Sequence, residues 1–177
     1  MSALLRTLYG YHAWANADLF DKLSTLDETQ AAERQTALRL LNHVLVVARI
    51  FAAHLSGTAH DYASSNTEET PTLDELRGAF AEIDTWYLDY VCGASPHELS
   101  EKVAFRFTDG DEGMMTREEM LAHIVTHSGY HCGEVGRVLW QLSVTPPWDT
   151  FAVYLHHAAP ARRTKDITAS IAIPTCA

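Results

Sequence analysis

Four long stretches of the chain repeat apolar residues at helical spacing, and no proline interrupts them. They cover about residues 2–24, 36–56, 72–93 and 117–142. An apolar stripe at three- and four-residue spacing marks a helix that buries one face against its neighbours. The sequence therefore predicts an all-α fold, a four-helix bundle.

Local signals predict where these helices begin and end. Thr72 with Glu75, and Thr116 with Glu119, have the spacing of a capping box, which opens a helix. Gly57 predicts the end of the second helix. The proline pair at 146–147 stops the fourth helix, and a short helix over 149–157 follows.

The segment over 101–115 has a different period. Val103, Phe105 and Phe107 alternate with polar or small residues, and Asp109-Gly110 follows them. Alternation before an Asp-Gly pair is typical of a β-hairpin, although the second arm is weak. We expect a small hairpin-like excursion before the last long helix.

The long connection over 57–71 bears on topology. About fifteen extended residues can span roughly 50 Å, whereas a twenty-residue helix is only about 30 Å long. The connection can therefore cross the whole bundle, which predicts the up-down-down-up order. A slack connection between antiparallel helices is the alternative.

Length and charge narrow the class of protein. A chain of 177 residues predicts one domain over 1–160, followed by an extended or mobile tail over 161–177. The formal net charge of −10 argues against nucleic acid as a partner, because such binding needs a basic face. It argues equally against an anionic membrane surface.

The expected location is the cytoplasm. The chain does not open with a basic region followed by an apolar core, so we expect no signal peptide. The apolar run over 40–55 is interrupted by polar residues and is too short to span a bilayer. Three widely spaced cysteines do not make a disulfide framework, which fits a reducing compartment. They are Cys92, Cys132 and Cys176.

Three histidines, His123, His127 and His131, lie four residues apart on the last long helix, along one stripe. Imidazole is a common ligand of zinc, nickel and copper ions. His123 and His131 are roughly 12 Å apart along the helix axis, too far apart to bind the same ion. One ion would therefore bind either His123 with His127 or His127 with His131. Gly129 and Gly133 leave room beside the second pair, which favours 127/131.

A site on one helix needs a further ligand, and the second long helix offers His43 and His54. Eleven residues separate them, so they cannot bind the same ion. His43 lies among apolar residues that should face the interior, where its nitrogens need partners. His54 is close to the helix end, where solvent can satisfy it. His43 is therefore the leading third ligand.

Two further residues near the pair are candidate ligands, Cys132 and Glu134. Cys132 leaves the helix about 100° away from His131 and is disfavoured. Glu134 is a fourth ligand, a partner of a ligand, or a solvated charge, and the solvated charge is favoured. The chain lacks the His-Glu-x-x-His pattern of zinc peptidases and a G-x-S-x-G nucleophile motif.

The run over 127–133, His-Ser-Gly-Tyr-His-Cys-Gly, resembles the H-x-x-Y-H-x-G motif of the DinB-like (DinB/YfiT) putative metalloenzymes. Tyr11-His12-Ala13-Trp14-Ala15-Asn16 resembles the opening of that family, and Asn42-His43, Gly57 and Asp109-Gly110 also match. The resemblance covers about residues 4–157. Cys132 departs from the family motif, which usually has a basic residue there.

The resemblance implies an up-down-down-up four-helix bundle, often dimeric. It also implies a divalent metal ion, zinc or nickel, held by one histidine of the second helix and two of the last. Those positions match His43, His127 and His131, while His123 matches a position often occupied by a histidine that is not a ligand. Some relatives are transferases that use bacillithiol, mycothiol or glutathione.

Three neutral histidines leave a bound ion with an open position, the mark of a catalytic site. The first hypothesis is a metal-dependent transferase that activates a small thiol for attack on an electrophile. A metal-dependent hydrolase is the neighbouring hypothesis, because water is activated in the same way. The rival is a non-catalytic, stress-related homodimer with a structural or sensory metal. The sequence assigns no catalytic residue beyond the metal ligands.

Overall fold

The structure, a computed structural model, describes residues 2–163. It is mostly helical, with a small two-stranded sheet. The helices are α1 (Ala3–Leu23), η1 (Glu28–Gln30), α2 (Ala31–Ser56), α3 (Leu73–Gly93), α4 (Pro96–Ser100), α5 (Arg117–Gln141), α6 (Phe151–Ala158) and η2 (Pro160–Arg162), and the strands are β1 (Lys102–Arg106) and β2 (Glu112–Thr116). The tail predicted over 161–177 lies almost wholly outside the described residues.

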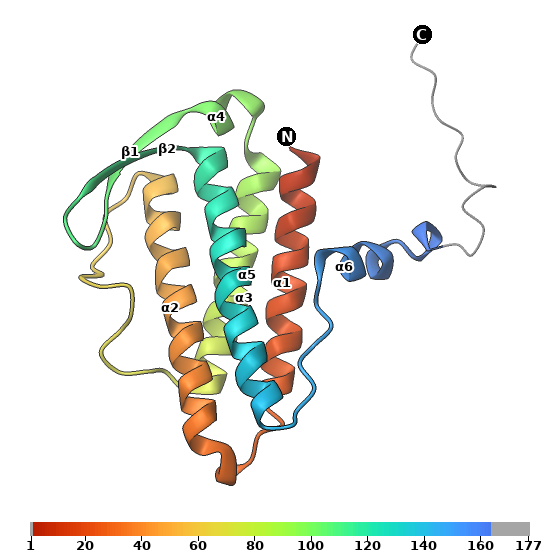
Figure 1. Ribbon diagram of the computed structural model, residues 1–177. Coiled ribbons are helices and arrows are strands. Elements are labelled where there is room, and N and C mark those ends of the chain that lie inside the picture. The colour runs from red at the N-terminus through yellow and green to blue at the C-terminus, as the bar shows by residue number, and fades with distance from the viewer. Residues whose placement is uncertain (1, 164–177) are drawn as a thin grey trace.

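The four long helices α1, α2, α3 and α5 lie side by side (Figure 1). α1 packs against α3 and α5, and α2 packs against the same two helices. In Figure 1, α1 and α5 run downward, whereas α2 and α3 run upward. The connection between α2 and α3 returns along the length of the molecule (Figure 1).

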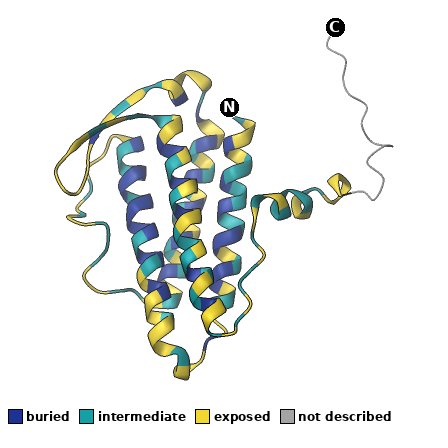
Figure 2. Cartoon of the chain, in the orientation of Figure 1, coloured by how far each residue is buried: buried dark blue, intermediate teal, exposed yellow. Residues whose placement is uncertain are grey.

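The buried residues face one another between the four long helices (Figure 2). One core cluster lies toward the hairpin and includes Leu5, Phe51 and Leu121. The other lies toward the opposite end and includes Leu41 and Leu139. Burial of such apolar side chains is the main force that holds helices of this kind together.

Both predicted capping boxes are present, at Thr72 with Glu75 and at Thr116 with Glu119. Helix α2 begins at Ala31, five residues before the predicted start near 36. Its first turn carries few apolar residues, so no apolar stripe predicts that the helix begins there. Helix α4 was not predicted, because five residues are too few to show a period.

The hairpin is confirmed, including its weak second arm. β1 pairs antiparallel with β2, and Phe105 lies opposite Gly113. A Cβ at Gly113 would lie 2.7 Å from the Phe105 ring, so any larger residue here would force the Phe105 and Phe107 rings to shift. The hairpin covers the end of α2, where Phe105 packs against Phe51 with ring centroids 5.7 Å apart.

One helical stretch, Glu28–Ser56, is long and apolar enough to cross a membrane by length and composition. Of its most apolar window, 67% is buried inside the protein. The expectation that this run is too short and too polar to span a bilayer is therefore not borne out by length and composition, but the burial is typical of the core helix of a folded domain.

Candidate metal site

His43 of α2 and His127 and His131 of α5 converge between the two helices. One ring nitrogen from each lies within 4.8 Å of the other two. The Nε2 atoms of His43 and His127 are 3.1 Å apart. The structure thus brings together the three histidines that the sequence selected, and all three are half-buried.

Hydrogen bonds on the far side of two rings fix how they face the centre. His43 Nδ1 donates to the carbonyl oxygen of Ser65 over 2.8 Å. His131 Nδ1 lies 2.6 Å from Glu134 Oε2 and donates to that carboxylate. In its neutral form, each of these two rings therefore carries its proton on Nδ1 and a lone pair on Nε2. Such outer partners are typical of histidines that bind metal ions.

The surroundings of His127 favour the neutral form of its ring. Burial, together with the nearby His131, His43 and His123, lowers the pKa of His127 to about 4. Neutral imidazole is the form that binds a cation. A ring held neutral near pH 7 is therefore ready to act as a ligand.

The spacing of the nitrogens fits one divalent ion. Tetrahedral Zn–N bonds of about 2.0–2.1 Å place two ligand nitrogens roughly 3.3 Å apart. The Nε2 atoms of His43 and His127 are 3.1 Å apart, which is close to that value. The nitrogens of all three histidines lie within 4.8 Å of one another, so small movements of the rings would bring every pair to the distance that zinc requires. Three imidazoles at this spacing can hold the ion and leave it an open position.

An apolar cavity of about 320 Å³ adjoins this group and shares His127 with it. Its walls include Phe51, Phe105 and Met115, with His123 beside His127. The His123 ring centroid is 5.3 Å from that of His127, and burial lowers the pKa of His123. A molecule in this cavity would lie next to the three-histidine group.

Two sequence interpretations need correction here. Glu134 is not simply a solvated charge, because its carboxylate accepts the hydrogen bond from His131. His54 is not satisfied by solvent: its Nε2 is buried without a partner among the described residues. Its ring packs against Phe105, with centroids 5.2 Å apart.

Cys132 lies away from the three histidines, as its position on the helix predicted. Its thiol is 3.8 Å from Asn16 Oδ1 and 3.7 Å from Ser128 Oγ. Burial raises the pKa of the Cys132 thiol to about 12. A neutral thiol pointing elsewhere is no ligand for this site.

Sequence reasoning missed Ser65, whose carbonyl holds His43. It contributes backbone only, from an irregular segment 22 residues further along the chain, so no side-chain pattern marks it. The role given to Gly129 and Gly133 was also misplaced. They line a cavity between α1 and α5, not the cavity beside His127.

These features define a class, the mostly helical proteins in which two helices present three histidines that could hold a metal ion. The model of the DinB family matches residues 1–166, so the chain belongs to the DinB family. It is also similar to Protein DinB of Bacillus subtilis (strain 168). The two are 24% identical over 166 residues, which cover 88% of this chain and 95% of the relative.

Removing the outer partner of His131 should weaken metal binding. Glu134→Gln replaces the carboxylate that orients the ring, and we expect the affinity for zinc to fall by about 10- to 100-fold. Titration against a chelator of known affinity measures the change. Glu118→Gln, an exposed glutamate in the first turn of the same helix, is the matched control. Equal affinities in both variants would contradict the role of Glu134.

The metal-free protein should lose stability as the pH falls from about 6.5 toward about 4. In that range His127 stays neutral in the folded chain, whereas its counterpart in the unfolded chain, with an ordinary pKa near 6.5, takes up a proton. Because the unfolded state then binds more protons, acid favours unfolding. Urea unfolding at pH 7.5 and pH 4.5 measures the loss. His127→Asn should show a smaller loss, and an equal loss would refute this cause.

Proposed function

We propose that this protein is a metal-dependent transferase that activates a small thiol for attack on an electrophile with an apolar body. The observation that carries the proposal is the convergence of three histidines beside an apolar cavity that shares His127. His43, His127 and His131 are the proposed ligands of a divalent ion, zinc or nickel. When bound, the ion supplies the positive charge that lowers the pKa of a thiol and favours the nucleophilic thiolate.

The residues of the chain have separate tasks in this proposal. The Ser65 carbonyl and the Glu134 carboxylate hold two ligand rings in orientation. Phe51, Phe105 and Met115 form the surface that receives the apolar body of the electrophile and excludes water from it. Binding the electrophile next to His127 would bring the two reactants together, which lowers the entropy cost of reaction.

The direct test is an assay of zinc- and nickel-loaded protein with glutathione, bacillithiol or mycothiol and chlorodinitrobenzene as an apolar aromatic electrophile. We expect release of chloride and formation of the thioether with at least one thiol. Phe105→Ala should raise KM for the electrophile while the metal content stays unchanged. Met114 of β2, 63% accessible and not among the residues that line this cavity, gives the control variant Met114→Ala, which should leave KM unchanged.

Hydrolysis is the alternative outcome of the same experiment. Cleavage of an ester or amide by the metal-loaded protein, with no turnover of any thiol, would replace the transferase proposal with a hydrolase. Full metal binding without either activity would support a non-catalytic metal-binding protein. Metal analysis of protein purified without an affinity tag precedes both assays.

We also propose that the four long helices form the up-down-down-up bundle expected of the family, and that the protein is a cytoplasmic homodimer. Two large aromatic side chains, Trp140 and Trp148, are 70% and 81% exposed. Exposed aromatic surface is typical of interfaces between subunits. Light scattering after size exclusion should give twice the chain mass, 19.7 kDa, and Trp140→Ser should lower the dimer fraction. A monomer at all concentrations would reject the dimer.

A further inference from the structure

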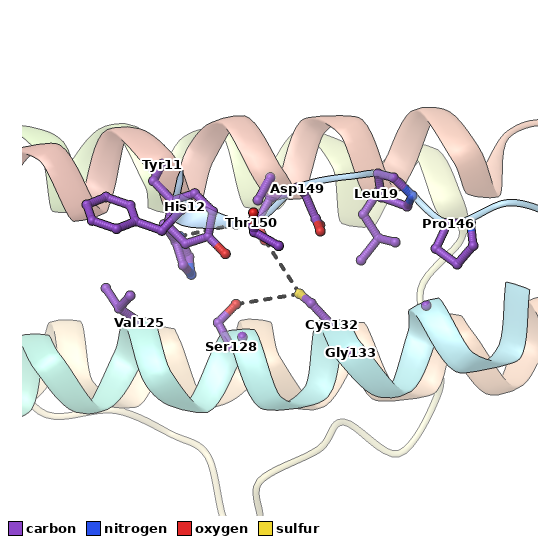
Figure 3. Close-up of a pocket in the computed structure, with 16 residues that line it drawn as sticks. Tyr11, His12, Leu19, Val125, Ser128, Cys132, Gly133, Pro146, Asp149 and Thr150 are labelled. Carbon is purple, nitrogen blue, oxygen red and sulfur yellow. Dashed lines mark hydrogen bonds between the residues drawn. The ribbon is translucent and has the colours of Figure 1, made fainter. Parts of the chain in front are cut away.

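A second cavity, of about 450 Å³, lies between α1 and α5 and is bordered by the segment over 146–151. Figure 3 shows His12 of α1 facing Ser128 and Cys132 of α5 across it. We call it the α1–α5 cavity. It shares no lining residue with the apolar cavity beside His127. It is thus a separate space on another side of α5.

A buried histidine is oriented at the wall of this cavity. His12 Nδ1 lies 2.9 Å from Asp84 Oδ1, and Asn16 Nδ2 donates to both oxygens of the same carboxylate over 3.2 and 3.0 Å. Since an ionised carboxylate only accepts, His12 Nδ1 carries a proton. In the neutral ring, Nε2 then holds a lone pair.

That lone pair has no partner. His12 is only 5% exposed, and its Nε2 is shielded from solvent without a hydrogen bond from any described residue. A buried polar atom left in this state costs free energy. Because His12 lines the cavity, a slight turn of its ring would bring Nε2 to a donor group on a bound molecule.

The charges around the cavity indicate which kind of donor group a bound molecule would carry. Asp149 lines it as a half-buried carboxylate, and among its described lining residues there is no lysine or arginine. Tyr11 and Phe151 contribute aromatic rings with centroids 5.4 Å apart. A carboxylate with aromatic surfaces favours an organic cation and repels an anion.

Two glycines keep the cavity open on the α5 side. Gly129 and Gly133 both line it, and a Cβ added at either would meet nothing within 4 Å. No close helix contact therefore requires them. Each weakens the helix by roughly 1 kcal/mol relative to alanine. Glycines that weaken the helix but leave space beside it are consistent with a cavity that binds a molecule.

We propose that the α1–α5 cavity is a binding site for a small organic amine in its protonated form. An N–H of the ammonium group donates to His12 Nε2, and its charge faces Asp149. The apolar body lies against Tyr11 and Phe151. This site is distinct from the three-histidine group and does not depend on the proposed transferase activity.

Three probes that share a phenylethyl body and differ in their polar group test the proposal on the full chain: 2-phenylethylamine, 2-phenylethanol and 3-phenylpropanoate. Calorimetry should show the amine binding at least about tenfold more tightly than the alcohol, a difference near 1.4 kcal/mol, and no binding of the carboxylate. The ¹⁵N signal of His12 Nε2 should shift on addition of the amine. Absence of amine binding at millimolar concentration, or equal binding of the carboxylate, would overturn the proposal.

Variants locate the binding. Gly129→Leu should fill the space and abolish amine binding, whereas Gly78→Leu, at an exposed glycine of α3 that also has open space around it, should not. Asp149→Asn should weaken the amine about tenfold and leave the alcohol unchanged. His43→Ala should bind the amine normally. Equal amine binding by the two leucine variants would place the amine elsewhere and refute the site.

Discussion

His127→Ala should abolish stoichiometric metal binding, the largest functional effect that we expect from one substitution. Wild-type protein purified without a tag and desalted should carry about one divalent ion per chain. His127 lies between the other two members of the group, with its Nε2 only 3.1 Å from that of His43. Since loss of an outer partner costs 10- to 100-fold in affinity, we expect loss of this direct ligand to cost at least about 100-fold. Elemental analysis and chelator competition measure it.

His43→Ala and His131→Ala should behave in the same way, whereas His123→Ala should keep its metal. His123 lies one turn from His127 on the same helix and lines the adjacent cavity, so it is the matched control for helix, residue type and burial. Circular dichroism checks that each variant keeps its helices. If His43→Ala and His127→Ala retain the full metal content with native helicity, the three-histidine site is wrong.

The same site links metal binding to stability. An ion that binds the folded chain alone stabilises it by about 4 kcal/mol when its concentration is a thousand times Kd. Chelation should therefore lower the melting temperature of wild type and of His123→Ala. It should leave the melting temperature of His127→Ala unchanged, because that variant has no ion to lose.

The sequence predicted the long helices because they carry both a period and end signals. Thr72 with Glu75 and Thr116 with Glu119 placed two helix starts at the residues where the structure has them. The start of α2 was placed too late, because Asp27 and Gln30 cap the preceding turn η1 and the apolar stripe begins only afterwards. Local capping chemistry decides such boundaries more than periodicity does.

The candidate site was accessible from sequence because three imidazoles on two helical stripes leave few ways to converge. Its outer partners were less accessible. The position of Glu134 in the sequence predicts only a glutamate on the helix surface. Its role as the hydrogen-bond partner of His131 depends on the side-chain rotamer, which the sequence does not indicate. Ser65 acts through a backbone carbonyl, which every residue has, so its identity carries no signal.

The buried network of α1 and α3 had no signal at all in the sequence. His12 belongs to the motif at the start of the chain, but Asp84 lies 72 residues away on a helix whose other acidic residues are mostly exposed. Their meeting depends on how α1 packs against α3. Long-range pairs of polar residues of this kind are set by tertiary packing, which no local pattern encodes.

Asp84→Ala should be the most destabilising polar substitution that we predict. The carboxylate is 6% exposed and accepts hydrogen bonds from His12 and twice from Asn16. Without it, two buried donors lose their partner, and each unsatisfied buried group costs about 1–3 kcal/mol. We expect the free energy of unfolding to fall by roughly 3 kcal/mol, and the melting temperature by about 6–12 °C. Thermal and urea unfolding of the metal-free protein measure both.

Asp21→Ala is the matched control, because it removes the same group from an ion pair at the surface. Asp21 pairs with Arg77 at 2.5 Å, but its side chain is 70% exposed, and such pairs contribute about 0–1 kcal/mol. The loss of stability in Asp84→Asn should lie between the losses in these two variants. Its amide oxygen still accepts one hydrogen bond, but its NH₂ group faces other donors. If Asp84→Ala loses no more stability than Asp21→Ala, the network does not hold α1 against α3. The orientation of His12 would then rest on apolar packing alone.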